Sequence, residues 1–198
     1  MITIVSGLPR SGTSLMMQML YAGGMPVLAD EVRPPDENNP RGYLEWEPVK
    51  RLRREPQSIS KGEGKVVKVV SPLLTSLPSD HAYRVIFMLR AICEILRSQA
   101  EMIRRRSATT SPHSAQSLTL AYQRHLVEVF AWMEHQNNVQ AIKVDYADII
   151  KNSAVQAERI RRFVDLNLDV DRMIRAVDPL LHRQHAKAEA SESPTVSS

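Results

Sequence analysis

Residues 7–14 are the part of the chain whose residue types and spacing best suit a chemical role. They read Gly-Leu-Pro-Arg-Ser-Gly-Thr-Ser and lie between an apolar run at 2–6 and a segment of helical periodicity at 13–22. The backbone N–H groups of such a loop, with the first turn of the following helix, form a binding site for an anion. The sequence therefore predicts an anion-binding strand, loop and helix at the start of the chain.

The spacing of this loop is that of the nucleotide-binding pattern G-x-x-x-x-G-K-[ST], except that Thr13 stands where the pattern has lysine. In nucleotide hydrolases that lysine reaches the β- and γ-phosphates, and the next Ser or Thr binds Mg²⁺. ATP or GTP chemistry is therefore disfavoured, although a P-loop kinase stays open as an alternative. Arg10 and three hydroxyl groups are what the loop still offers to an anion.

The surrounding pattern predicts an α/β fold. Apolar, β-branched runs predict strands at 2–6, 66–70, 84–89 and 139–144. Amphipathic periodicity predicts helices at 13–22, 92–106, 115–136, 154–166 and 169–177. The alternation favours a three-layer α/β/α, P-loop-like architecture around a mostly parallel sheet of four to five strands. We expect one domain over residues 1–186 and a disordered tail at 187–198.

The sheet must place the chemically interesting residues. In parallel sheets ligands bind at the carboxyl ends of the strands. This rule brings together the loop at 7–12, the end of the strand at 66–70, and Arg90, which follows the strand at 84–89. Lys68 interrupts an otherwise apolar strand, and a buried lysine needs a partner.

Composition excludes several classes of protein. The chain has 198 residues, a net charge of +4 and 5% aromatic residues, which argues against a nucleic-acid-binding protein. No apolar run approaches the ~18 residues of a membrane span, and the start does not resemble a signal peptide. We therefore expect a cytoplasmic protein without a membrane partner. Cys93 is the only cysteine, and its apolar-periodic surroundings predict a buried thiol.

A proline-rich segment at 25–48 is predicted to form a long loop. It carries two aromatic residues and two carboxylates, Tyr43, Glu45, Trp46 and Glu47. Long loops with such residues are more often functional than idle. The aromatic residues suggest a ligand with an apolar or ring component.

The run Pro9-Arg10-Ser11-Gly12-Thr13-Ser14 resembles the 5′-phosphosulfate loop of the sulfotransferases that use 3′-phosphoadenosine 5′-phosphosulfate (PAPS). In that family an arginine that ends a strand, and a serine eight residues later, bind the 3′-phosphate. Arg90 and Ser98 have this spacing. The segment at 144–150 resembles the family's strand and Tyr-x-Asp-Leu turn, and those at 39–43 and 177–183 resemble a bacterial-type subgroup. The resemblance covers residues 1–185.

This resemblance implies in-line transfer of a sulfuryl group from PAPS to a hydroxyl or amine of a small-molecule, saccharide or peptide acceptor. The product of the donor would be adenosine 3′,5′-bisphosphate, and no metal would be needed. Arg10 and Lys68 would stabilise negative charge on the leaving 5′-phosphate oxygen. The residues implied to bind the donor are Pro9, Arg10, Ser11, Gly12, Thr13, Ser14, Arg90 and Ser98.

The resemblance identifies the general base less clearly than it identifies the donor-binding residues. Cytosolic arylsulfotransferases of the family have a histidine two residues after the lysine of the second strand, where this chain has Val70. Other members use a glutamate. We expect Glu45 to accept the proton of the acceptor, with Glu47 as the second candidate, and a base from elsewhere stays open.

Two departures from the family keep an inactive relative open as an alternative. Ala91 follows Arg90 where the family commonly has an acidic or amide residue, and no histidine follows Lys68 at the usual place. Such a relative would bind the bisphosphate nucleotide without catalysing transfer. Structural roles also stay open: a surface arginine for Arg10, an ion pair for Arg90, a helix-bonded hydroxyl for Ser98 and a structural partner for Lys68.

Overall fold

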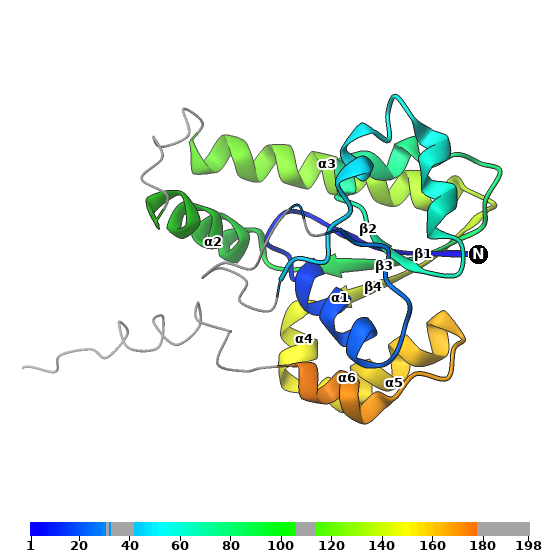
Figure 1. Cartoon of the computed structure of the whole chain (residues 1–198). Helices are drawn as coiled ribbons and strands as arrows, with labels where there is room; N and C mark the ends of the chain where they lie inside the picture. Colours follow the sequence, from blue (N-terminus) through cyan, green and yellow to red (C-terminus); the bar gives the residue numbers. More distant parts are fainter. Residues whose placement is uncertain (31, 33–41, 106–113, 178–198) are drawn as a thin grey trace, which may run out of the picture.

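The computed structural model describes residues 1–30, 32, 42–105 and 114–177 (Figure 1). Several predicted features lie outside these residues. They are the tail at 187–198, the first three residues of the 39–43 motif and most of the 177–183 motif. The polar composition of residues 107–114 also predicts a loop there, and all of it except Ser114 lies outside the described residues.

The strands form a four-stranded parallel sheet in the order β2-β1-β3-β4. Their bounds are β1 Ile2–Gly7, β2 Val66–Lys68, β3 Tyr83–Leu89 and β4 Val139–Asp145. In the central strand, Val5 lies opposite Lys68 on one side and Ile86 on the other. The predicted parallel sheet is confirmed, and the parallel direction brings the ends of β1, β2 and β3 to one edge.

The helices follow the predicted segments closely. Their bounds are α1 Thr13–Ala22, α2 Ile92–Arg105, α3 Ala115–His135, α4 Tyr146–Lys151, α5 Ser153–Val164 and α6 Val170–Ala176. Three 3₁₀-helices complete the described elements: η1 Glu47–Arg51, η2 Pro56–Gly62 and η3 Ser71–Ser76. Each of these 3₁₀-helices has a proline in its first turn.

Two apolar clusters cover the two faces of the sheet and give the predicted three layers. One cluster joins α1, α4, α5 and α6 to residues such as Val5, Ile86 and Met88. The other joins α3 and the 3₁₀-helices to Ile4 and Phe87. Figure 1 shows this arrangement, with α3 and the α4–α6 group on opposite sides of the sheet. No helix of the described residues is long and apolar enough to cross a membrane.

Several local predictions are wrong. The basic segment at 47–56 is predicted to form a short helix and residues 57–64 a loop, but residues 47–62 form η1 and η2 instead. The turn expected after β4 is helix α4, which begins because the Asp145 carboxylate accepts the N–H of Ala147 at 2.7 Å. Cys93 is exposed, because it lies on the outer side of α2 while Ile95 faces the core. Trp46, the residue directly before η1, is buried in the core cluster and is therefore not exposed on a binding loop.

We expect the Ile86→Ala variant to lose about 2–5 kcal/mol of unfolding free energy, because Ile86 is fully buried in the central part of the sheet. Val155 is 66% exposed on α5, so Val155→Ala should change this free energy by less than about 0.5 kcal/mol. Urea denaturation of both variants measures the difference. Equal losses would show that the core does not lie where the structure places it.

Candidate active site

The loop between β1 and α1 turns through two residues with positive φ. Arg10 has φ 72°, and Gly12, the N-cap residue of α1, has φ 100°. A Cβ atom on Gly12 would lie 2.5 Å from Cδ2 of Tyr146, so glycine suits both the backbone angle and the close contact. No side chain caps the start of α1. The first N–H groups and the helix dipole therefore favour an anion at this position.

Ser11 adds a buried hydroxyl to this loop. The residue is 1% exposed, and its Oγ has no hydrogen-bond partner within the described part of the chain. A Cβ atom on Gly7 would lie 2.4 Å from that oxygen, which places the hydroxyl against the end of β1. An unpaired buried hydroxyl costs about 1–3 kcal/mol. An anionic oxygen held in the loop would remove that cost, so the loop fits a phosphate group.

The two predicted phosphate sites are direct neighbours. Arg10 donates from Nε to Oγ of Ser98 at 2.8 Å, which joins the loop to α2. Arg90 donates from Nη1 to the carbonyl oxygen of Arg10 at 3.2 Å. The structure therefore brings Arg10, Arg90 and Ser98 together, although Ser98 lies 88 residues from Arg10 in the sequence.

The side chain of Arg90 is held by two further groups. Its Nε lies 2.8 Å from Oε2 of Glu94, one helical turn into α2. Its guanidinium carbon lies 4.5 Å from the centre of the Tyr146 ring. Burial raises the pKa of Tyr146, while the charge of Arg90 acts in the opposite direction. The ion pair with Glu94 fits a structural role for Arg90, and the same contacts fix the guanidinium beside the loop.

Lys68 connects three segments at the end of β2. Its side chain is 6% exposed. The ammonium group donates to Oγ of Ser14 at 2.9 Å, to the carbonyl oxygen of Tyr43 at 3.2 Å and to Oε1 of Glu45 at 3.0 Å. Lys68 thereby links the first turn of α1 to the segment that carries the candidate base.

The two candidate carboxylates have different surroundings. Glu45 faces Lys68 and keeps 26% of its side chain exposed. Glu47 instead forms an ion pair with Lys50 within η1, at 2.7 Å, and is 43% exposed. The structure therefore places Glu45 beside the loop and gives Glu47 a partner of its own on the surface.

A histidine near the end of β2 was not predicted as part of the site. Nε2 of His125, on α3, lies 2.9 Å from Oγ of Ser71, which follows β2 after two residues. On the same side of α3, Tyr122 accepts a hydrogen bond from Gln99, the neighbour of Ser98, at 2.7 Å. The polar positions at i and i+3 within an amphipathic helix were the signal in the sequence that could have identified this side of α3.

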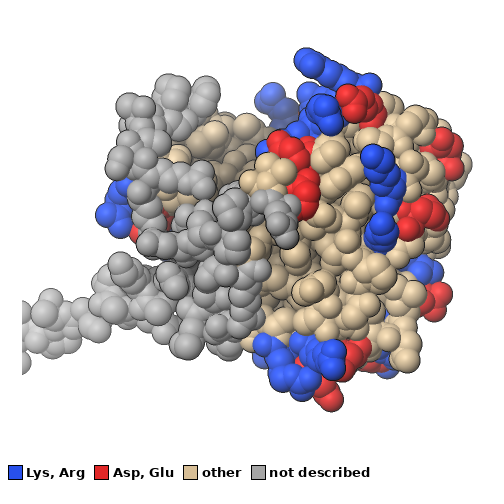
Figure 2. Space-filling model, viewed as in Figure 1, with Lys and Arg blue, Asp and Glu red and all other residues tan. Residues whose placement is uncertain are grey.

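Neither a single charge sign on the face shown in Figure 2 nor a metal-binding group is found among the residues that the structure describes. Figure 2 shows basic and acidic side chains interspersed on the described surface of this face. Within the same described ranges, no group of three or more His, Cys, Asp or Glu residues could hold a metal ion.

Comparison with known proteins gives a family and a fold. A family model described as "Sulfotransferase domain" matches residues 2–196. The fold is similar to that of retinol dehydratase in complex with androsterone and the inactive cofactor PAP, with 15% identity and a TM-score of 0.50 over 88% of this chain. It is also similar to mouse sulfotransferase SULT7A1 complexed with PAP, with 15% identity and a TM-score of 0.52 over 98% of this chain. The matched region covers 62% of the retinol dehydratase chain and 67% of the SULT7A1 chain. This chain therefore spans less than two thirds of the length of the first of these proteins. No curated protein sequence matches significantly.

We expect the stability of the chain to rise with pH through the titration of His125. Burial lowers the pKa of this imidazole, so below about pH 6.5 the unfolded chain binds more protons than the folded chain. The stabilisation is therefore present above that pH and is lost as the pH falls. Thermal denaturation at pH 7 and pH 5 should show a larger loss for the parent chain than for His125→Gln. An equal loss in both chains would contradict the burial of the imidazole.

Proposed function

Since the chain belongs to the sulfotransferase domain family, we propose that it transfers a sulfuryl group from PAPS to a hydroxyl or amine of an acceptor. The observation that supports this most directly is the contact between Arg10, Arg90 and Ser98, which would provide neighbouring sites for two phosphate groups. A nucleotide with both a 5′- and a 3′-phosphate suits such a pair better than a nucleoside monophosphate. The motifs at 39–43 and 177–183 support a place in the bacterial-type subgroup.

We assign the donor-binding roles as follows. The loop N–H groups, the side chain of Arg10 and the hydroxyls of Ser11, Thr13 and Ser14 would hold the 5′-phosphate, and exposed Pro9 shapes the turn. Arg90 and Ser98 would hold the 3′-phosphate. PAPS, when bound, supplies a sulfuryl group on a phosphate leaving group. Charge-assisted hydrogen bonds from a guanidinium to phosphate oxygens are the strongest that the protein can offer here.

Glu45 and Lys68 are the groups we place at the reacting atoms. Glu45 would accept the proton from the acceptor hydroxyl as the new O–S bond forms and the bond from sulfur to the phosphate oxygen breaks. Lys68 and Arg10 would stabilise the negative charge that the phosphate oxygen gains. The ammonium of Lys68 lies 3.0 Å from Oε1 of Glu45 and favours its ionised form, which is the form that a base requires.

Two further interpretations remain predictions from the sequence. These are a single domain over residues 1–186 and a cytoplasmic location. The acceptor would be a small molecule, a saccharide or a peptide.

Ligand binding tests the donor site. We expect adenosine 3′,5′-bisphosphate to raise the melting temperature more than AMP or ATP–Mg²⁺ at the same concentration. Arg90→Gln should weaken bisphosphate binding by about 10-fold or more, because it removes a charged donor, and should leave AMP binding nearly unchanged. Arg97→Gln, a change at an exposed arginine of α2, the helix that follows Arg90, is the matched control. If AMP stabilises the chain as well as the bisphosphate does, the assignment of Arg90 and Ser98 is wrong.

Turnover tests the base. With an acceptor found by screening phenols, alcohols and amines with PAPS, Glu45→Gln should lower kcat by about 10²–10⁴-fold, as expected for loss of a general base. Its affinity for the bisphosphate should stay within twofold of the parent value. Glu47→Gln should turn over normally, because that carboxylate pairs with Lys50 on the surface. Undiminished turnover of Glu45→Gln would refute the assignment of Glu45 as the general base. Tight bisphosphate binding with no acceptor turned over would favour the inactive relative.

A further inference from the structure

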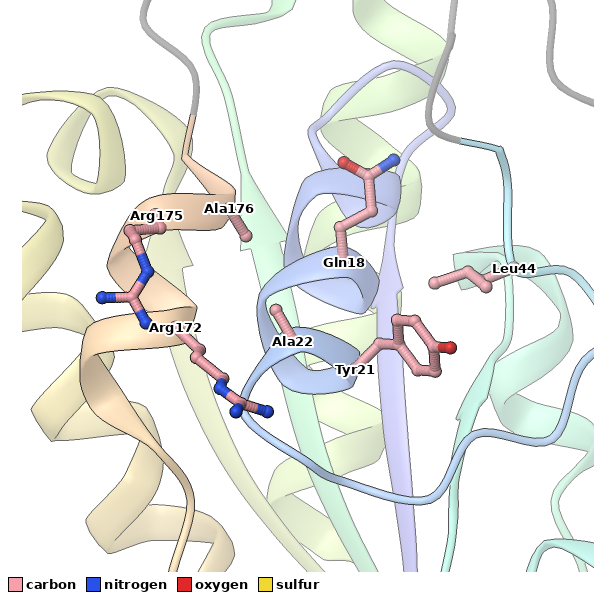
Figure 3. A pocket seen from close by; sticks show the side chains of 7 residues that line it. All are labelled: Gln18, Tyr21, Ala22, Leu44, Arg172, Arg175 and Ala176. Atoms are coloured by element: carbon pink, nitrogen blue, oxygen red, sulfur yellow. The ribbon is translucent and has the colours of Figure 1, made fainter.

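A groove of about 490 Å³ lies between α1, α6 and the segment that follows Gly42 (Figure 3). From α1 it is lined by Gln18, Tyr21 and Ala22, and from the opposite wall by Leu44. Most of its lining is apolar, and Tyr21 keeps 63% of its surface exposed. An exposed aromatic ring beside small and aliphatic side chains suits the apolar body of a ligand.

Arginine side chains lie at the α6 side of the groove. Figure 3 shows Arg172 and Arg175 on the wall opposite Leu44, and Figure 2 shows basic side chains gathered over α6 at the lower edge of the molecule. Arg172 is paired with Asp169 at 3.2 Å, whereas Arg175 has no ion pair within the described residues. An apolar groove that ends at an arginine suits a ligand with an apolar body and one anionic group.

Two of the residues that line the groove, Gln18 and Leu44, are close in sequence to residues of the candidate active site. Gln18 lies one helical turn after Ser14, whose hydroxyl binds Lys68, and Gln18 also donates to the carbonyl oxygen of Gly42 at 3.0 Å. Ser14 and Ala22 are eight residues apart on α1, which corresponds to ~12 Å along the helix axis. A ligand of that length lying along α1 would extend from the turn that contacts Lys68 to Ala22, with Arg172 and Arg175 of α6 beside it.

The backbone at Leu44 also links the groove to the cluster formed by Lys68, Tyr43 and Glu45. Leu44 has φ 49°, a left-handed conformation that is uncommon for an aliphatic residue. Its neighbours on both sides, Tyr43 and Glu45, bind Lys68, while the side chain of Leu44 itself lines the groove. Strained backbone of this kind persists only where its surroundings enforce it, and it often marks a ligand site.

We propose that this groove holds the body of the sulfuryl acceptor, and that the acceptor is an amphipathic molecule with a nucleophilic hydroxyl or amine at one end and a carboxylate or similar anion at the other. The nucleophilic end would lie at Glu45, the apolar body along Tyr21, Ala22 and Leu44, and the anion at Arg175. This inference rests on the proposed sulfuryl transfer, because it names the acceptor for that reaction.

A matched pair of ligands tests the groove by binding alone. The acid 6-(4-hydroxyphenyl)hexanoate and its methyl ester differ at the end far from the phenol, where the ester lacks the negative charge and carries one additional methyl group. By calorimetry we expect the acid to bind about fivefold tighter, a difference typical of an exposed ion pair. Arg175→Gln should abolish this preference. Arg162→Gln, which removes an exposed arginine of α5 outside the groove, should keep it. Ala22→Trp should weaken the binding of both ligands at least 10-fold by filling the groove.

Kinetics with PAPS tests the acceptor assignment. We expect kcat/KM to be higher for the acid than for the ester because the acid has the lower KM. Arg175→Gln should remove this preference for the acid by raising its KM, without lowering kcat. The inference is wrong if the acid and the ester bind equally well. It is also wrong if neither ligand binds, or if Ala22→Trp leaves binding unchanged, because the groove would then be covered or unused.

The bisphosphate serves as the reference that separates the two proposals. Each variant should bind adenosine 3′,5′-bisphosphate like the parent chain, which shows that it is folded. If the bisphosphate binds and the groove variants have no effect, the groove is not the acceptor site while the donor proposal stands. If the acid binds in the groove and the bisphosphate does not bind, sulfuryl transfer is refuted instead.

Discussion

The ammonium group of Lys68 is the constraint on which the rest of the site depends. It is the one charged side chain among the buried residues of the described chain. A buried charge is costly unless it is paired and hydrogen-bonded, and here the partners come from the first turn of α1 and the segment after Gly42. The need to satisfy this one group holds both segments against the end of β2. The loop between β1 and α1, the candidate base and the groove wall are therefore parts of one packed unit.

The order of strands and helices was predictable because each element carries its own signal. Buried parallel strands read as apolar runs and covering helices as amphipathic periods, and both patterns are local. The segments that were predicted wrongly lack such a signal. Proline in the first turn of η1 and η2 permits a short 3₁₀-helix as readily as a loop. The end of β4 passes into α4 through a cap at Asp145, a side-chain contact that periodicity does not reveal.

The residues proposed for the site were predictable in type, whereas most of their partners were not. Resemblance in short motifs selected Arg10, Arg90, Ser98 and Lys68 from the sequence. It did not show that Arg10 is bonded to Ser98, because hydrogen bonds between segments so far apart in sequence depend on tertiary packing. The choice between Glu45 and Glu47 likewise depends on which carboxylate faces β2. The two residues are only two positions apart in an irregular segment, and the sequence alone does not determine which of them points toward β2.

The hydrogen bond between Arg10 and Ser98 would also make the two proposed phosphate sites thermodynamically dependent on each other. Any ligand that draws Arg10 toward the 5′ position must exchange this contact for a new one, and the buried Ser98 oxygen then loses the hydrogen bond that it accepts from Arg10. A second phosphate would offset this loss by accepting a hydrogen bond from the Ser98 hydroxyl, whereas a ligand with a single phosphate would not. By the reciprocity of linked equilibria, occupation of either site then favours occupation of the other. Discrimination among nucleotides would in this way arise from an exchange of hydrogen bonds within the protein, without a contact to the base.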